Sequence, residues 1–322
     1  MKKRINIRDV AKAAGVSITT VSRALNGYSD VSEETRKKIK EVASTLNYMP
    51  NINARALGGI SETTIGLLVS DLQPYDYSNM AIGMITGVYE ACAEYGCEFI
   101  LLATDVERQS KQNFLQLCRK KNIDGIVATG LRTNDIYYKD IIKGDIPSVL
   151  MDINTSGKNL CSVSIDNVKA SDDAVKYLIE SGHRHIGMIN GEHVAGVSKE
   201  RFLGYEKALK ESNIDLKKEY IKYSDFNEQK AYEDVISLMK GNKEITALFC
   251  ASDLMAIGAI KAVEELGLRI PEDISVIGFD DIPVSKYISG GLTTIRQDPY
   301  KMGHLAVVLY EFLKGCRGSS EH

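Results

Sequence analysis

The segment from residue 17 to residue 26 combines four hydroxyl side chains with an arginine and an asparagine. Hydroxyl groups form single hydrogen bonds with base edges, a guanidinium pairs with guanine or phosphate, and methyl groups contact thymine. Composition alone favours a plainer interpretation, the exposed polar face of a small helical hairpin. The candidate base-contacting residues are Ser17, Ile18, Thr19, Thr20, Ser22, Arg23 and Asn26.

Two short helices on either side of Gly15 are predicted to position this segment. Asn6 and Asp9 have the spacing of a capping box for the first helix, and Gly15 suits the left-handed residue that ends it. Ser17 is a suitable cap for the second helix. Such a tight connection predicts a helix-turn-helix whose second helix enters the major groove of DNA. The predicted inner faces are Val10, Ala13, Ala14, Val21, Ala24 and Leu25.

A third predicted helix begins after Ser32 and completes a small core with Ile39, Val42, Ala43 and Leu46. Residues 1–60 contain eleven Lys or Arg and five Asp or Glu, a net charge of +6. The whole chain carries −3, so the remainder carries −9. A basic end on an acidic body is typical of a phosphate-binding module joined to a second function.

The remainder of the chain alternates short apolar segments with amphipathic ones, which predicts parallel sheets covered by helices. We therefore expect an α/β fold with a three-helix headpiece and a body of two sheets, with a crossing near Leu160. The predicted strands are Thr64–Ser70, Glu98–Thr104, Gly125–Thr129, Ser148–Asp152, Ser162–Ile165, His185–Ile189, Ala247–Cys250 and Ser275–Phe279.

Polar residues directly follow six of these strands, at the ends where open parallel sheets bind ligands. Carboxylates there suit ligands that carry hydroxyl or amine groups. Because Asp and Ser after a strand also cap helices, a purely structural role is the alternative for each. The six residues are Asp71, Asp152, Asp166, Asn190, Ser252 and Asp280.

Composition excludes several other classes. The chain has 322 residues and is 44% hydrophobic, without an apolar run long enough for a membrane span or a secretory signal. Its six cysteines form no CxxC pair, which favours a reduced, cytoplasmic protein. No phosphate-binding loop, nucleophile elbow or metal-ligand spacing is present, so we expect no enzyme, cofactor or metal. His183 and His185 alternate along a strand and are predicted to be structural.

Three motifs resemble the LacI/GalR (lactose-repressor) family of bacterial transcription regulators. The first motif comprises residues 7–11 and 20–27, the second residues 31–36 and the third residues 46–51. The similarity extends to about residue 314. It implies a homodimeric repressor that binds a pseudo-palindromic operator in double-stranded DNA, with a small effector between two lobes. It also implies a hinge helix at 50–60, with Arg55 on DNA and Leu57 wedged into a base step. Asn53 departs from the family, which suggests either weaker pairing of two hinges or pairing through an Asn–Asn hydrogen bond.

The resemblance also implies an effector site. Asp152 and Asp280 are similar to carboxylates that accept hydroxyl groups, Arg201 to a clamping arginine and Phe226 to an aromatic that stacks on the ligand. Ser252 and Gln297 match polar pocket positions. These groups suit a sugar or sugar derivative. Asp71 and Tyr75 are further candidates, although the loop 72–78 departs from the family's pattern.

Three alternatives to a sugar-controlled repressor remain at this point. A purine co-repressor or a phosphorylated partner protein could control DNA binding, and a transport-type solute-binding protein shares the two-lobed body. The expected domains are a headpiece at 1–49, a hinge at 50–60, a first lobe at 61–160 with 292–314, a second lobe at 161–291 and a polar tail at 315–322.

Overall fold

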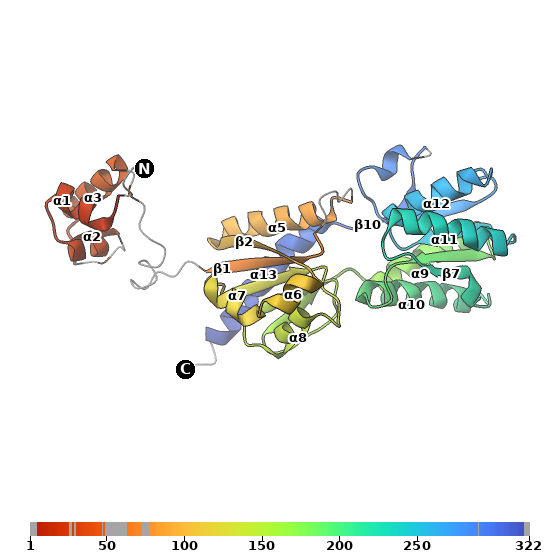
Figure 1. The fold of residues 1–322 in the computed structure, drawn as a ribbon, viewed down its shortest axis with the longest axis horizontal. Coiled ribbons are helices and arrows are strands. Elements are labelled where there is room, and N and C mark those ends of the chain that lie inside the picture. Colours follow the sequence, from red (N-terminus) through yellow and green to blue (C-terminus); the bar gives the residue numbers. More distant parts are fainter. Residues whose placement is uncertain are drawn as a thin grey trace. The chain divides into compact units, whose positions relative to one another are not determined.

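The computed structural model describes residues 5–25, 28, 30–46, 48, 63–72, 78–288 and 290–318 (Figure 1). The chain divides into two compact units, residues 1–63 and residues 64–322, which we call the headpiece and the body. The predicted hinge at 50–60 and most of the loop 72–78 lie outside the described residues. The same holds for the site candidates Asn26, Arg55, Leu57 and Tyr75.

The headpiece contains three helices that begin at the predicted caps, and the first of them ends at the predicted glycine. They are α1 (Ile7–Ala14), α2 (Ile18–Leu25) and α3 (Glu33–Thr45). Asn6 and Asp9 form the capping box of α1, and Gly15 ends that helix with a φ of 71°. The hydroxyls of Ser17 and Ser32 accept the backbone N–H groups of Thr20 and Thr35. The local capping chemistry of this segment was therefore predictable.

The core of the headpiece differs from the prediction at one position. Ala13 is exposed, whereas Ala11 is buried beside Val10 and Ala14. The reason is that α1 contacts both α2 and α3, so its buried face extends over Ala11 rather than Ala13. Arg36 completes the unit from α3, donating to the backbone carbonyls of Ala24, Tyr28 and Val31.

The first sheet of the body is parallel, with the strand order β2-β1-β3-β4-β5. One face packs against α5 (Met80–Tyr95) and α13 (Pro299–Gly318), and the other against α6 (Val106–Lys111), α7 (Phe114–Lys120) and α8 (Ile136–Lys143). Successive residues of β1 alternate between these two cores, because strand side chains point to opposite faces. The strands are β1 (Thr64–Ser70), β2 (Glu98–Thr104), β3 (Gly125–Thr129), β4 (Ser148–Met151) and β5 (Leu160–Val163).

The second sheet is also parallel, with the order β10-β9-β8-β6-β7. Helix α9 (Asn167–Glu180) pairs with α10 (Gly196–Glu211), and α11 (Glu228–Gly241) pairs with α12 (Asp253–Glu265). Short helices η1 (Lys218–Tyr220) and η2 (Ser285–Tyr287) lie in the connections. The strands are β6 (Ile186–Asn190), β7 (Ile221–Tyr223), β8 (Ala247–Cys250), β9 (Ser275–Asp280) and β10 (Thr293–Arg296).

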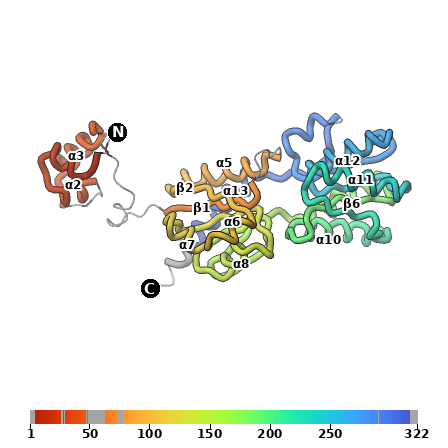
Figure 2. Tube along the Cα trace, viewed as in Figure 1, coloured from red at the N-terminus to blue at the C-terminus, as the bar shows by residue number. Residues whose placement is uncertain are grey.

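The chain passes between the sheets at positions that differ from those expected. Strand β5 pairs with β4 in the first sheet, so the first sheet extends beyond Leu160. Strand β10 pairs with β9 in the second sheet, although residues 292–314 were placed with the first lobe. The return to the first sheet is made by α13, which lies beside α5 (Figure 2). Helix α13 continues to Gly318, so residues 315–318 are helical rather than a tail.

The predicted fold class is confirmed: a helix-turn-helix headpiece joined to an α/β body of two five-stranded parallel sheets. Within the described ranges, no helix combines the length and the apolar character needed to cross a membrane.

Candidate functional site

The first turn of α2 presents a mixed polar and apolar surface. Ile18 is 43% exposed and Thr19 is also exposed. The Ser17 hydroxyl accepts the Thr20 backbone N–H at 3.0 Å and lies 2.8 Å from the Thr20 hydroxyl. The cap therefore engages the hydroxyls of Ser17 and Thr20, and Ile18 and Thr19 are the side chains most available to another molecule.

Arg23 lies one turn further along and is held by its neighbours. Its guanidinium forms an ion pair with Asp30 at 2.7 Å and stacks over the Tyr28 ring at 4.6 Å from the centroid. The Arg23 side chain is still 43% exposed. Arg23 therefore reaches solvent in a fixed orientation, which lowers the entropy lost when such a side chain binds a guanine or a phosphate.

Arg201 is a buried charge of the body, with 4% of its surface exposed. It projects from α10, and its Nε donates to Asn167 Oδ1 at 3.0 Å while its Nη1 donates to the Ala251 carbonyl at 2.5 Å. Its Cζ lies 3.8 Å from the centroid of the Phe279 ring. A guanidinium has five N–H donors, so these contacts fix its position and leave donors for a ligand.

Asp280, at the end of β9, is the acidic partner of Arg201. Its Oδ1 lies 3.8 Å from Arg201 Nη1 and accepts a 2.7 Å hydrogen bond from Gln297 Nε2. Asp152 interacts electrostatically with Arg201 and accepts a hydrogen bond from the Ser164 hydroxyl at 3.3 Å. We call Asp152, Arg201, Asp280 and Gln297 the Arg201 cluster. The tertiary fold brings together these four of the predicted effector residues.

Burial removes the carboxylates of the Arg201 cluster from water and shifts their pKa values. Burial raises the pKa of Asp280 to about 7, against the opposing effect of Arg201. Burial also raises the pKa of Asp152, again opposed by Arg201. Burial lowers the pKa of Arg201, which the two carboxylates counteract. Near neutral pH, Asp280 can therefore accept a hydrogen bond when ionised or donate one when protonated.

Gln297 contributes a buried acceptor to the cluster. The residue is 7% exposed, and its Oε1 has no hydrogen-bond partner among the described residues. The Ser70 hydroxyl, at the end of β1, is also buried and has no hydrogen-bond partner among the described residues. Leaving a buried polar atom unsatisfied costs about 1–3 kcal/mol. A bound ligand or water would recover that energy at both positions.

Other strand-following residues serve the fold rather than the cluster. Ser252 caps α12 by accepting the Met255 N–H at 3.2 Å, and Asp166 caps α9 by accepting the Lys169 N–H at 2.9 Å. Asn190 binds the Ser198 carbonyl at 3.0 Å. The structural alternative for residues of this kind thus applies to these three.

Asp71 and Phe226 lie apart from the contacts of the Arg201 cluster. The Asp71 carboxylate pairs with Arg132, and Asp71 has a φ of 55°. Phe226 has a φ of 56° and lies so close to Gly191 that a Cβ there would be 2.1 Å from its ring. Positive φ values at such residues are a strain that functional sites often retain.

Arg132 is a site residue that no sequence motif indicated. Its guanidinium binds both oxygens of Glu192, at 2.5 Å from Nε and 2.8 Å from Nη2, while Nη1 pairs with Asp71. Asp71 and Arg132 follow strands of the first sheet, and Glu192 follows β6 of the second. One side chain therefore links the two halves of the body.

Asn167 and the aromatic pair His193–Tyr223 were also not predicted from the sequence. Asn167 orients Arg201 from the start of α9, next to the strand-following Asp166 that the pattern did identify. His193 and Tyr223 stack with their ring centroids 3.4 Å apart, beyond the carboxyl ends of β6 and β7. His183 bonds to Thr246 and Ser275, as suits a structural histidine. In the part of the chain that the structure describes, no group of three metal-binding side chains occurs.

Comparison with known proteins decides the family. Residues 6–51 match the lacI family of bacterial regulatory proteins, and residues 175–313 match a periplasmic binding protein-like domain. The HTH-type transcriptional regulator MalR of Clostridium butyricum is 36% identical over 323 residues, covering 99% of this chain and 95% of that protein. The chain belongs to the LacI family.

Other LacI-family proteins share the whole arrangement. The HTH-type transcriptional repressor PurR of Aliivibrio salmonicida (strain LFI1238) is 34% identical, over 96% of this chain and 92% of its own length. The Lac repressor dimer bound to operator and the anti-inducer ONPF superimposes with a TM-score of 0.85 at 26% identity, covering 97% of this chain and 94% of that one. A CelR–cellobiose complex gives 0.73 at 28% identity, with the same coverage of 97% and 94%.

Membership of the family confirms the predicted class of function. The chain is a DNA-binding transcriptional regulator rather than an enzyme, with a helix-turn-helix headpiece and an effector-binding type of body. The headpiece and the body are therefore parts of one regulatory protein, and the solute-transport alternative is set aside.

Proposed function

We propose that the chain is a homodimeric repressor whose affinity for a pseudo-palindromic operator is set by a small polyhydroxylated effector bound at the Arg201 cluster. Such a protein acts on DNA in the bacterial cytoplasm. The observation that carries the proposal is the unpartnered Oε1 of Gln297, buried beside the Asp280 carboxylate. It marks a place where a ligand can supply a hydrogen-bond donor to a buried acceptor.

The remaining groups of the cluster define the chemistry of that ligand. Asp152 and Asp280 offer carboxylate oxygens, and Arg201 offers N–H donors in a fixed orientation. Sugar hydroxyls both donate and accept hydrogen bonds, so they match a site that presents both kinds of group. Aromatic surface is supplied by Phe226, His193 and Tyr223, which lie at or after the carboxyl ends of β6 and β7. An apolar sugar face can pack against such rings.

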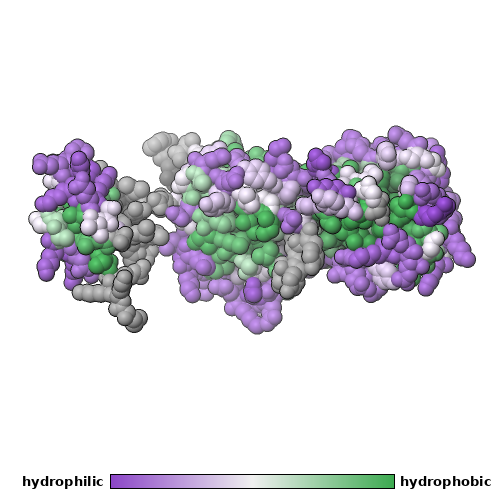
Figure 3. Space-filling model, turned by 90° about the horizontal axis from the view of Figure 1, so that it is seen from above, coloured by the Kyte–Doolittle hydropathy of each residue, from purple (hydrophilic) through white to green (hydrophobic). Residues whose placement is uncertain are grey.

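Dimer formation is supported by an exposed apolar surface on α5 and β2. Ile82 is 57% exposed, Tyr89 60% and Leu101 42%. Figure 3 shows hydrophobic side chains gathered over the first sheet when the molecule is seen from the side of α5. Exposed apolar groups that gather in one area commonly mark a protein interface. Two headpieces in a dimer would read the two half-sites of a pseudo-palindrome.

The link formed by Arg132 supports coupling between effector and operator. It joins the strand ends of the first sheet to Glu192 of the second sheet. An effector bound between the two halves would favour one arrangement of these strand ends over another. By reciprocity, an effector that weakens operator binding is itself bound more weakly in the presence of operator.

A purine is the second candidate effector. The observation that favours it is the 34% identity to a repressor named PurR, over 96% of this chain. Planar purines would use Phe226 and the acceptor oxygens of the cluster rather than a set of hydroxyl contacts. The two classes are therefore distinguished by which ligand changes operator affinity.

The test is operator affinity of the full-length protein, measured against a palindromic operator library with and without sugars, sugar phosphates and purines. We expect one sugar-type compound to change the affinity by about tenfold or more, equivalent to about 1.4 kcal/mol. Asp280→Asn should abolish that response, and the matched control Asp281→Asn should retain it. A response to purines alone, or to no compound, would contradict the sugar proposal.

A further inference from the structure

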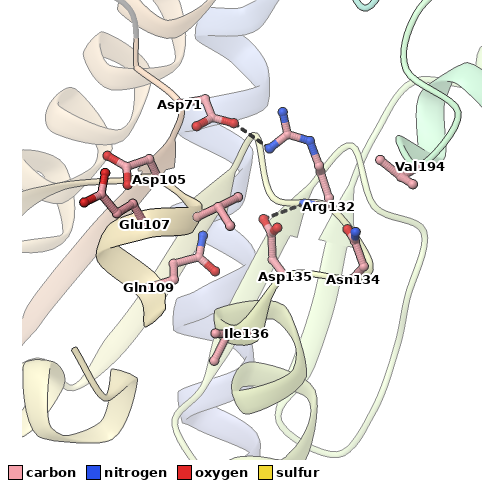
Figure 4. A pocket seen from close by; sticks show the side chains of 10 residues that line it. Asp71, Asp105, Glu107, Gln109, Arg132, Asn134, Asp135, Ile136 and Val194 are labelled. Atoms are coloured by element: carbon pink, nitrogen blue, oxygen red, sulfur yellow. Dashed lines mark hydrogen bonds and ion pairs between the residues drawn. The ribbon is translucent and has the colours of Figure 1, made fainter. Parts of the chain in front are cut away.

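A pocket with a volume of about 640 Å³ lies in the body beyond the carboxyl ends of β1, β2 and β3 (Figure 4). Its polar wall consists of Asp71, Asp105, Glu107, Gln109, Arg132, Asn134 and Asp135. None of the four residues of the Arg201 cluster lines it. The pocket is therefore a distinct place in the body, and its size is that of ordinary small-molecule sites.

Gln109 carries an unsatisfied donor into this pocket. The residue is 3% exposed, and its Oε1 accepts the Tyr137 backbone N–H at 3.2 Å. Its Nε2 is buried without a partner among the described residues. Figure 4 shows the carbonyl oxygen turned toward the start of α8 and the amide nitrogen turned the opposite way, among the side chains of the pocket. The tertiary structure thus holds an N–H group where only a bound acceptor can satisfy it.

The carboxylates around Gln109 have cationic or N–H partners that reduce their local charge. Asp105 accepts the Arg108 N–H at 2.7 Å and lies 3.3 Å from the Arg108 guanidinium. Glu107 pairs with Lys111. Asp135 accepts the Arg132 N–H at 3.0 Å. Each carboxylate has about four acceptor positions, so all three can accept further hydrogen bonds.

These groups select the chemical class of the occupant. A simple cation would use the carboxylates but would face the Arg132 guanidinium and leave the Gln109 donor unsatisfied. An anion would face four carboxylates, those of Asp71, Asp105, Glu107 and Asp135. Neutral hydroxyl groups donate to the carboxylates and accept from Gln109 and Arg132, so they satisfy both sets of groups. Val106, Ile136 and Val194 add apolar surface for the carbon skeleton of a ring.

We propose that this pocket is a second carbohydrate site that binds one sugar ring independently of the Arg201 cluster. The proposal shares the chemical class of its ligand with the proposed function but uses none of the four residues of the Arg201 cluster. Asp71, a predicted effector residue outside that cluster, lines this pocket. Because Arg132 belongs to the pocket and also holds Glu192, a sugar bound here would contact the side chain that links the two halves of the body. The site would then adjust the response to an effector at the cluster.

The test is calorimetric titration of the full-length protein with glucose, maltose and cellobiose, and with spermidine as a cationic probe. Ile136→Trp should fill the pocket without disturbing the core, because Ile136 is 45% exposed. Ile142→Trp is the matched control, since Ile142 lies on the same helix, is 41% exposed and does not line the pocket. Gln109→Glu keeps the oxygen that faces Tyr137 and removes the N–H donor.

We expect Ile136→Trp to weaken the binding of at least one sugar by about tenfold or more. Gln109→Glu should weaken the same sugar, and Ile142→Trp should leave its affinity unchanged. Asp280→Asn, which removes the cluster's carboxylate, should spare this binding event. The proposal is overturned if no sugar binds the wild type, if Ile136→Trp has no effect, or if only spermidine responds to it. Sugar binding lost in Asp280→Asn and retained in Ile136→Trp would support the proposed function and refute the second site.

Discussion

At the residue scale, the body depends on a few charged side chains whose partners come from distant parts of the chain. Arg201 on α10 reaches Asn167 on α9, Ala251 after β8 and Asp280 at the end of β9. Each of these contacts replaces hydrogen bonds to water that burial removed. The same desolvation that raises the pKa of Asp280 makes this carboxylate sensitive to pH in the neutral range.

The titration of Asp280 predicts a pH-dependent stability. Because its folded-state pKa of about 7 exceeds the unfolded value of about 3.9, the folded state holds an extra proton between these pH values. Its contribution to stability is therefore full below about pH 4 and is lost as the pH rises through about 7. Asp280→Asn removes this loss, so the variant should gain stability relative to wild type between about pH 5 and pH 8.

Urea unfolding at the two pH values measures this difference. Asp281→Asn serves as the control, because Asp281 is the adjacent carboxylate and pairs with the exposed Arg296. The control should show no comparable change with pH. An Asp280→Asn variant whose stability relative to wild type is the same at both pH values would refute the assignment of this titration.

The ion pair between Arg132 and Glu192 predicts a measurable coupling energy. The two side chains are 23% and 24% exposed and make two hydrogen bonds, so the pair should exceed an exposed surface pair. A double-mutant cycle with Arg132→Met and Glu192→Gln should give about 1–2 kcal/mol in urea unfolding. The exposed pair Lys261–Glu228 should give less than about 1 kcal/mol. Equal couplings would show that Arg132 does not hold the two halves together.

At the scale of elements, small residues allow helices to pack closely on both sheets. A Cβ at Gly87 of α5 would lie 2.0 Å from the Tyr300 carbonyl oxygen of α13. A Cβ at Gly204 of α10 would lie 2.3 Å from the Val168 carbonyl oxygen of α9. Both neighbours are backbone atoms within helices, so they cannot move aside as a flexible side chain would. These glycines set the distance between the paired helices.

Gly87→Ala should therefore destabilise the body by roughly 1–3 kcal/mol, because α5 and α13 must separate to admit the methyl group. Gly241→Ala is the control, since nothing lies within 4 Å of a Cβ at that position on α11. Thermal unfolding of the two variants gives the comparison. If both alanine variants unfold at the wild-type temperature, the close packing of α5 on α13 does not limit stability.

At the scale of the whole molecule, the proposed function requires two copies of the chain, and the exposed face of α5 and β2 is the proposed contact. The rings of Tyr89 and Phe99 pack edge to face with their centroids 6.3 Å apart, and this contact restricts the orientation of the Tyr89 ring. An aromatic ring in a fixed orientation contributes contact area with little loss of entropy on association. The face can therefore support association without rearrangement.

Tyr89→Glu should shift the protein toward monomers and weaken operator binding, because it places a charge in the apolar contact. Tyr177→Glu on α9 is matched in exposure, at 57% against 60%, and should leave both properties unchanged. Analytical ultracentrifugation and operator titration of the same samples give the two readouts. A Tyr89→Glu variant that remains dimeric would place the interface elsewhere.

The sequence by itself determined the local features of this protein. Residue type and spacing predicted the caps at Asn6, Ser17 and Ser32, the termination at Gly15 and the bounds of β1, β2, β3 and β8, because helix and strand periods are local. They did not predict β7 and β10 as strands. The family resemblance named Arg201 and Asp280 as effector residues, and the structure places their charged groups 3.8 Å apart. Only the tertiary structure placed β10 in the second sheet, paired Arg132 with Glu192 and left the amide groups of Gln109 and Gln297 incompletely bonded. Those features depend on which distant segments pack together. The periodicity of each segment reports only its own secondary structure, so it does not determine the energy of a contact between two segments.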